Sequence, residues 1–598
     1  MSRLLHSALD AINTQQYQSA LNILNKSTQH SADWYLLLAL SYAGLSKFTE
    51  AENTYLRAFK DYAGHIPLLE NYTNLLCRQH KYAQCITFFN TLPKTINSEK
   101  VHLNVIESLL NTEQLLQAEK RLADPPSAAP LLPRYQWLKL DLYERLGNLD
   151  KVDQYIDSLP VETKQQFFFQ YKRACNLRSM GKFTEALTVL LALQQQSQQH
   201  NAELNFIIGC TYYDLMQFAA AERYLKQCLQ LAPNYVPAHE CLNKLYWEQS
   251  NAAALMSSYQ VTLARYPANP TLVHSQLGQL LQINDLDNAL HVATQATKQF
   301  PDNLDIKHAH SIILAKHGND EEAFSVLMDI VKLAPQSARY SIDLANYCIH
   351  NNDYQAAIAY LQNTLKFNPF NQEIWAYLST AWRLSGNDQY HWLTNYQQFV
   401  KVMELPTPKG FGSFAAFNTE LKQLLLGMHT KQQQPLDQSV RSGSQTDGHL
   451  LYRSNHLLSL FKQSMESCIY RYLGDLPTDP THPLTARNQQ QFMTRGSWSV
   501  KLEQGGYHAN HIHPQGWLSA PSYISTPHEM NNQDKTKSGW LKLGETSLGL
   551  GERESIAREI CPEEGQIIIF PSYIWHGTNK LTSNQPRLTI PCDITPLR

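Results

Sequence analysis

The sequence predicts a multidomain α + β protein in which an N-terminal, all-α superhelical solenoid precedes a smaller β domain. Two patterns carry this prediction. Prolines recur every 34 residues through the middle of the chain, each after an apolar helical run, and from residue 496 the pattern changes to short alternating runs separated by glycine and proline. The composition agrees with a folded, helix-rich chain, because glycine supplies only 24 of 598 residues while 43% are hydrophobic.

Two kinds of residue carry the 34-residue period. The helix-ending prolines are Pro233, Pro267, Pro301, Pro335 and Pro369. Small or aliphatic residues follow the same spacing at Ala221, Leu255, Ala289, Ala323 and Ala357. Proline cannot continue a helix, and a small side chain lets two helices cross closely. A period of 34 with both features is typical of tetratricopeptide (TPR) repeats, which are pairs of antiparallel helices.

The same period continues upstream more loosely. Its members there are Ala20, Ala51, Cys85, Ala118, Val152 and Ala186. We therefore predict about 11 repeats, with a closing helix over residues 392–405, and assign residues 1–404 to a TPR solenoid. A stack of this length has an extended concave face, which usually holds a peptide or a partner helix. The alternative is that the array only shapes the molecule or mediates its dimerisation.

Residues 405–495 are predicted to form a helical linker and support region. Helical patterns cover 414–429 and 450–473, and the polar stretch 431–448 is expected to be a loop or a linker. Residues 496–598 are predicted to form a β core, with strands at 497–502, 539–543, 565–570 and 587–594. A tail of about a hundred residues with this pattern fits a barrel or a sandwich.

Charge and cysteine usage narrow the classes of partner. The formal net charge is -2 and only 17% of residues are charged, so no cationic field attracts nucleic acid or anionic lipid. The ten cysteines contain no CxxC pair, which indicates reduced thiols. No segment has the apolar length of a signal peptide or of a membrane span. We expect a cytoplasmic protein that binds neither nucleic acid nor membrane, and its oligomeric state stays open.

Four residues of the β tail indicate chemistry. His511 and His513 stand at i and i+2, so on a strand both imidazoles point to the same face. His576 follows an apolar strand and can close a site from across a barrel. Arg587 starts the next strand, where its guanidinium can hold a carboxylate in bidentate fashion. An HxH pair alone is weak support for a metal, but this order of four residues is typical of a non-haem Fe(II) site that binds 2-oxoglutarate.

The C-terminal part resembles bacterial tetratricopeptide proteins that end in a 2-oxoglutarate/Fe(II)-dependent oxygenase domain. The stretches that carry the resemblance are PLDQSVRSGSQT (435–446), GSWSVKL (496–502), HANHIHPQGWLS (508–519), GWLKLGE (539–545), FPSYIWHGT (570–578) and RLTIPCDITP (587–596). The resemblance implies a double-stranded β-helix (jelly-roll or cupin-like) with flanking helices. It also implies Fe(II), 2-oxoglutarate and O2 as cofactor and cosubstrates, with His511, His513 and His576 as iron ligands. Arg587 would bind the distal carboxylate of 2-oxoglutarate, with Tyr523 as a second donor.

The chain departs from the wider pattern at two places. Oxygenases of this superfamily usually have Asp or Glu where His513 stands, so the site either uses three histidines or recruits another carboxylate or a water. A Tyr-Tyr pair of the family is replaced by Ser522 and Tyr523. Three tryptophans, Trp517, Trp540 and Trp575, are candidates for the pocket wall, although plain core positions suit them better.

These observations favour a dioxygenase that hydroxylates a side chain of a protein or peptide held by the TPR groove. No catalytic residue beyond the metal and cosubstrate ligands is predicted. Two alternatives stay open. One is a TPR scaffold with a degenerate oxygenase domain, and the other is an oxygenase that acts on a small molecule.

Overall fold

The computed structural model describes residues 3–93, 96–126, 132–196, 201–429 and 439–597. These residues fall into two compact units. One unit comprises residues 1–155 with the last two residues of the chain, and the other comprises residues 156–596. No helix of the described residues is long and apolar enough to cross a membrane.

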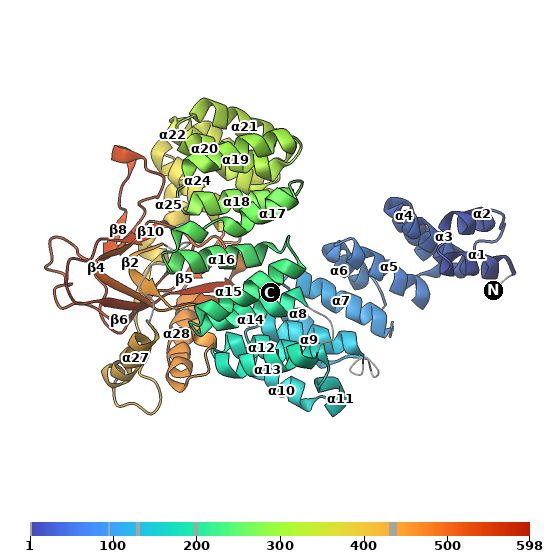
Figure 1. Ribbon diagram of the computed structural model, residues 1–598, viewed down its shortest axis with the longest axis horizontal. Helices are drawn as coiled ribbons and strands as arrows, with labels where there is room; N and C mark the ends of the chain where they lie inside the picture. The colour runs from blue at the N-terminus through green and yellow to red at the C-terminus, as the bar shows by residue number, and fades with distance from the viewer. Residues whose placement is uncertain (1–2, 94–95, 127–131, 197–200, 430–438, 598) are drawn as a thin grey trace. The chain divides into compact units, whose positions relative to one another are not determined.

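The first unit consists of helix pairs joined by short turns (Figure 1). Its helices are α1 (Arg3–Asn13), α2 (Tyr17–Leu24), α3 (Ala32–Gly44), α4 (Phe48–Tyr62), α5 (Ile66–Arg78), α6 (Tyr82–Asn90), α7 (Glu99–Asn111), α8 (Leu115–Ala123) and α9 (Pro133–Arg145), and α10 (Leu149–Ser158) crosses into the second unit. Serine caps start some of the first helices: Ser31 accepts a hydrogen bond from the Trp34 amide, and Ser98 accepts one from the Val101 amide.

The second unit continues the pairs. Its helices are α11 (Val161–Lys164), α12 (Phe167–Ser179), α13 (Phe183–Gln196), α14 (Ala202–Asp214), α15 (Phe218–Leu231), α16 (Val236–Glu248), α17 (Ser257–Arg265), α18 (Pro270–Gln282), α19 (Leu286–Gln299), α20 (Leu304–Lys316), α21 (Asp320–Leu333), α22 (Ala338–His350), α23 (Tyr354–Leu365) and α24 (Gln372–Ser385). With the short α11 set aside, helices α1 to α23 make eleven pairs within the described ranges. The predicted TPR solenoid is confirmed.

The backbone repeats with the sequence. A left-handed residue follows the first helix of every described pair, at Gln15, Ser46, His80, Glu113, Gly147, Gly181, Met216, Ser250, Asn284, Gly318 and Asn352. Such a residue ends a helix and reverses the chain. The small residues of the period are fully buried where the two helices cross, with one exception at Leu255. There the second helix starts late, after a short 3-10 turn (Ala252–Ala254) and a left-handed Met256.

The expected closing helix over 392–405 is wrong. The chain forms two short helices, α25 (Gln389–Thr394) and α26 (Tyr396–Phe399), and then a strand, β1 (Lys401–Glu404). β1 pairs antiparallel with β9 (Gln566–Pro571) over its whole length. The backbone hydrogen bonds that β9 offers at this edge override the helical pattern of the segment, so residues 401–404 belong to the sheet.

The segment between the repeats and the β core contains more strand than the sequence predicts. The predicted helix at 414–429 is confirmed as α27 (Phe414–Met428), and the helix predicted at 450–473 is present as a 3-10 turn (Leu450–Tyr452) and α28 (His456–Gly474). Within the polar stretch expected to be a loop, residues 431–438 lie outside the described residues. The remainder includes β2 (Val440–Gln445), which pairs with β4 (Val500–His508).

The β core is a curled sheet in which every described strand pair is antiparallel. Its strands are β3 (Phe492–Ser497), β4 (Val500–His508), β5 (Leu518–Ser519), β6 (Ser522–Ser525), β9, β11 (Arg587–Ile590) and β12 (Cys592–Pro596), in the order β2-β4-β11-β6-β9-β5-β12-β3. A second sheet has the order β10-β7-β8 and contains β7 (Leu541–Leu543), β8 (Arg558–Ile560) and β10 (His576–Thr578). This curled arrangement is the predicted jelly-roll-like fold.

The last repeats and the β core share one hydrophobic core. It runs without interruption from α22 to β12. Trp575 donates to the Thr380 hydroxyl at 3.1 Å on α24, and Tyr573 donates to the Leu393 carbonyl at 2.9 Å on α25. Figure 1 shows the yellow helices of the last repeats beside the red strands. A fragment that starts at residue 405 would therefore lose β1 and expose part of this core.

Candidate metal centre

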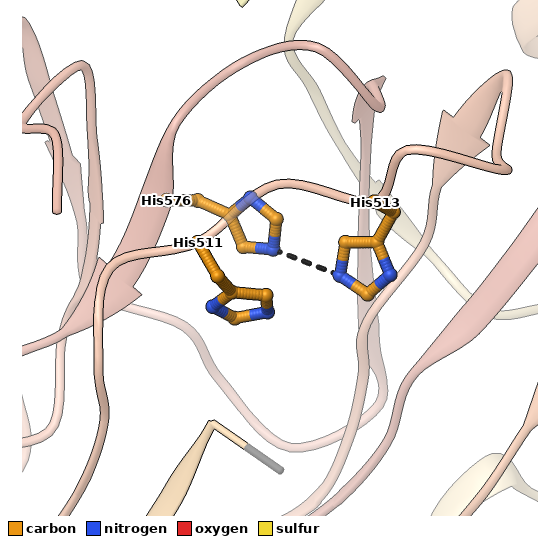
Figure 2. Close-up of side chains that lie close together, drawn as sticks. All are labelled: His511, His513 and His576. Atoms are coloured by element: carbon orange, nitrogen blue, oxygen red, sulfur yellow. Dashed lines mark hydrogen bonds between the residues drawn. The ribbon is translucent and has the colours of Figure 1, made fainter. Parts of the chain in front are cut away.

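Three imidazoles from two distant segments meet in the β core. His511 and His576 are paired through their backbones, with each amide donating to the carbonyl of the other residue at 2.9 and 3.0 Å. The His513 amide donates to the Ser572 carbonyl at 3.2 Å. Figure 2 shows the three rings pointing toward one another, and one nitrogen of each ring lies within 4.8 Å of the other two. The sequence prediction that these histidines converge agrees with this geometry.

Local hydrogen bonds fix which nitrogen faces the common point. The Nδ1 atom of His511 lies 2.7 Å from the Ala509 carbonyl, and the Nδ1 atom of His576 lies 2.9 Å from the Ile574 carbonyl. A carbonyl only accepts, so Nδ1 carries the proton and the lone pair is on Nε2. The Nε2 atoms of His513 and His576 are 3.2 Å apart (Figure 2). Two imidazole nitrogens that bind one ion side by side are separated by about 3 Å.

The third imidazole, that of His513, contacts a carboxylate that the sequence analysis did not single out. A buried oxygen of Asp593 lies 2.7 Å from the Nδ1 atom of His513. An anionic oxygen at this distance favours the proton on Nδ1 and leaves Nε2 free for a metal, which is how carboxylates orient metal-binding histidines. Asp593 thus places a carboxylate beside the ring of His513 rather than at position 513 itself. The sequence feature that could have pointed to Asp593 is its position six residues after Arg587.

Burial keeps the ring nitrogens available for a metal. Desolvation lowers the pKa of His511 to about 3 and the pKa of His576 well below its usual value, and the neighbouring imidazoles add to both shifts. Neutral imidazole is the form that ligates metals. His508 is half-buried, and desolvation lowers its pKa as well, but its Nδ1 atom contacts the Ser439 hydroxyl at 3.1 Å and it lies outside the ligand cluster.

Close packing around His576 requires glycine at the next position. A Cβ atom on Gly577 would lie 2.3 Å from the Asn510 side-chain oxygen and 3.0 Å from the His508 carbonyl. Asn510 in turn donates to Glu545 at 2.8 Å and to the Thr546 carbonyl at 2.9 Å. The segments that bear the first and third histidines are therefore held together without room for a side chain between them.

Arg587 and Tyr523 line the same cavity, and each has a buried polar atom without a hydrogen-bond partner among the described residues. The Arg587 side chain is 2% exposed and donates to the Gly539 carbonyl at 2.7 Å, while its Nε atom has no hydrogen-bond partner among the described residues. The buried Tyr523 hydroxyl also has none, and the guanidinium lies 5.1 Å from the centre of its ring. Desolvation lowers the pKa of Arg587 because no described carboxylate pairs with it. A buried cation beside an unused hydroxyl suits an anionic ligand.

The site cavity has a volume of about 370 Å³, within the range of small-ligand sites. Its lining includes all three histidines, Arg587, Tyr523, Asp593 and the half-buried Trp498. The ring of Trp498 stacks on His513 with an interplanar angle of 15°. The three tryptophans considered from the sequence do not line this cavity; for example, Trp517 is fully buried and donates to the Leu484 carbonyl at 2.9 Å. The wall tryptophan was therefore missed.

Replacing Asp593 by asparagine is expected to weaken metal binding about 10- to 100-fold, because His513 loses the anion that holds its proton on Nδ1. The affinity for Fe(II) or Mn(II) is measured anaerobically by equilibrium dialysis. Asp329→Asn, which changes an exposed carboxylate on α21, serves as the matched control. Equal affinities of Asp593→Asn and the control would show that Asp593 does not position the ligand.

Comparisons with known proteins agree with this geometry. The family model described as "Putative 2OG-Fe(II) oxygenase" matches residues 496–593, which include the three histidines, Tyr523, Arg587 and Asp593. The tetratricopeptide repeat model matches residues 202–235, the segment of α14 and α15. Comparison with the curated proteins gives no match.

Several solved structures are similar to the chain at low identity. A tetratricopeptide repeat protein from Parabacteroides merdae is 17% identical over 40% of this chain and 95% of that chain, with a TM-score of 0.33. Yeast Tom70 is 13% identical over 65% and 96%, with a TM-score of 0.28. A chain of the APC/C hetero-tetramer Cut9-Hcn1 is 14% identical over 65% of this chain and 78% of that chain, with a TM-score of 0.27. The family models thus match a tetratricopeptide repeat within the helical part of the chain and a 2OG-Fe(II) oxygenase domain at its C-terminal end.

Proposed function

We propose that this protein is an Fe(II)/2-oxoglutarate-dependent dioxygenase that hydroxylates a side chain of a polypeptide. The observation that carries the proposal is the convergence of three Nε2 atoms, each backed by an oxygen at Nδ1, in one cavity with a buried arginine that no described carboxylate neutralises. The donor set suits iron, because imidazoles bind Fe(II) and the cavity leaves room for a cosubstrate.

The chain's own residues divide the work in this proposal. His511, His513 and His576 hold the ion, and Asp593 fixes the ring of His513. Arg587 and Tyr523 bind the distal carboxylate of 2-oxoglutarate and so orient its keto acid end toward the histidines. An iron ion held by the three histidines would supply the chemistry of the family, in which O2 oxidatively decarboxylates 2-oxoglutarate to succinate and CO2 and the second oxygen atom is inserted into a substrate C–H bond.

Two features support a polypeptide substrate. Eleven helix pairs offer far more surface than a small metabolite needs, and stacked repeats commonly bind peptides. The β core is also packed on the last repeats through a shared hydrophobic core, and both belong to the second unit. The alternatives, a scaffold without chemistry and an oxygenase for a small molecule, make different predictions in the assay below.

The test uses the full-length protein, because a fragment beginning at 405 would lack β1. Protein prepared anaerobically is expected to bind one Fe(II) per chain and, once O2 is admitted, to convert 2-oxoglutarate to succinate at a slow basal rate. A polypeptide that is a substrate should raise the rate of succinate formation, and its mass should increase by the mass of one oxygen atom. Iron stoichiometry near zero together with no succinate would support the scaffold. Stimulation by small molecules alone would support the small-molecule oxygenase.

A further inference from the structure

Two more cavities continue from the metal centre toward the repeats. The junction cavity, of about 460 Å³, is lined by the loop after β2, by β3 and by Lys244 of α16. The repeat cavity, of about 420 Å³, is lined by the first helices of three successive repeats, α12, α14 and α16, and by Arg453. All of these residues belong to the second unit.

Shared lining residues join the three cavities in series. The site cavity and the junction cavity have Gln445 and Trp498 in common. The junction cavity and the repeat cavity have Lys244, Asp447, Gly448 and His449 in common. Trp498, whose ring stacks on the candidate ligand His513, is therefore the wall between the metal centre and the space that leads to the repeats.

Among the described lining residues of the two outer cavities, cationic side chains outnumber carboxylates. Their cationic side chains are Arg178, Lys244, Arg453 and Arg495, and their carboxylates are Asp214 and Asp447. Arg178 pairs closely with Asp214 at 2.5 Å. Lys244 pairs with Asp447 at 3.9 Å, and both of these side chains are 35% exposed. A long, solvent-accessible ion pair contributes little stability, so Lys244 can also pair with a carboxylate of a ligand.

We propose that the three cavities form one substrate track for an extended, acidic segment of the polypeptide substrate. The segment would cross the first helices of three repeats, place a carboxylate at Lys244, and present the reacting side chain past Trp498 to the metal centre. This inference rests on the proposed function and names its substrate class. A peptide is favoured over nucleic acid because the track starts on tetratricopeptide helices and the chain as a whole is slightly acidic.

Binding of defined probes tests the charge preference. The probes are fluorescein-labelled 12-residue Gly/Ser peptides carrying three glutamates or three lysines, and a 12-nucleotide RNA, each titrated into the full-length protein. The glutamate peptide is expected to bind at least about tenfold more tightly than the lysine peptide, and its affinity should fall with salt. Lys244→Glu should weaken binding of the glutamate peptide about tenfold, and Lys244→Met should weaken it less. Lys332→Glu changes an exposed lysine on α21 and should leave binding of this peptide unchanged. Equal binding of the two peptides, tighter binding of the RNA, or no effect of Lys244→Glu would overturn the proposal.

Two natural cysteines locate the bound peptide. Half-buried Cys241 lines the repeat cavity, whereas half-buried Cys561 does not. The glutamate peptide is expected to slow alkylation of Cys241 at least threefold, measured by mass spectrometry, and to leave Cys561 unchanged. Unchanged alkylation of Cys241 at saturating peptide would place the peptide elsewhere and refute the track. Iron content and substrate-free succinate formation of the wild type test the oxygenase separately from peptide binding, so a failed track and a failed oxygenase give different results.

Discussion

Replacing His576 by alanine is expected to reduce the affinity for Fe(II) by about a hundredfold or more and to abolish succinate formation. His576 is the most buried of the three histidines, its Nε2 atom lies 3.2 Å from that of His513, and its backbone is paired with His511. Loss of one of three protein ligands exceeds the 10- to 100-fold effect typical of an outer-shell partner. Metal affinity is measured by anaerobic dialysis and succinate by mass spectrometry.

A buried histidine away from the cavity supplies the control. His482 contacts the Leu393 carbonyl through Nε2 at 3.2 Å and accepts from the Leu484 amide at Nδ1, so His482→Gln also removes a buried imidazole. Both variants are checked for folding by circular dichroism. If His576→Ala retained full iron affinity while folded, the three imidazoles would not be a metal site and the proposed function would fail.

The repeats could be predicted from the sequence because their structure is local. Each small residue of the period packs against the neighbouring helix within the same or the next repeat, so a fixed spacing records the contact directly. Leu255 departs from the small residues of the period, and there the second helix is interrupted. In this part of the chain, the spacing of small residues in the sequence is therefore enough to predict how the helices pack.

Pairing between distant segments explains what the sequence could not predict. The segments 401–404 and 440–445 became strands because β9 and β4 offer them backbone partners, and no local pattern reports such an edge. Asp593 lies 2.7 Å from a ring 80 residues earlier in the chain. The histidines could be found from their order along the sequence. Asp593 and Trp498 reach the site only through folding of the β core, and the residues of the proposed track depend on how that core packs on the repeats.

Replacing Arg587 by glutamine is expected to weaken 2-oxoglutarate binding roughly hundredfold, since losing one partner of a buried charged pair typically costs about 2–5 kcal/mol. Tyr523→Phe removes a single neutral donor and should cost about 1 kcal/mol, or about fivefold. Neither residue belongs to the histidine cluster, so iron affinity in the absence of 2-oxoglutarate should be unchanged in both variants. Dialysis with labelled 2-oxoglutarate measures these affinities, and equal affinity of wild type and Arg587→Gln would exclude this arginine as the carboxylate partner.

The thermal stability of an Arg587 variant distinguishes a ligand-binding role of this arginine from a structural role. Arg587 is buried with no carboxylate partner among the described residues, which opposes folding in the absence of a ligand. Arg587→Met should therefore unfold at the same temperature as the wild type or at a higher one when 2-oxoglutarate is absent. When 2-oxoglutarate is added to the Mn(II)-loaded proteins, the wild type should gain more stability than the variant, because a ligand stabilises the state that binds it in proportion to its affinity. A structural arginine would show the opposite result, with the variant less stable under both conditions.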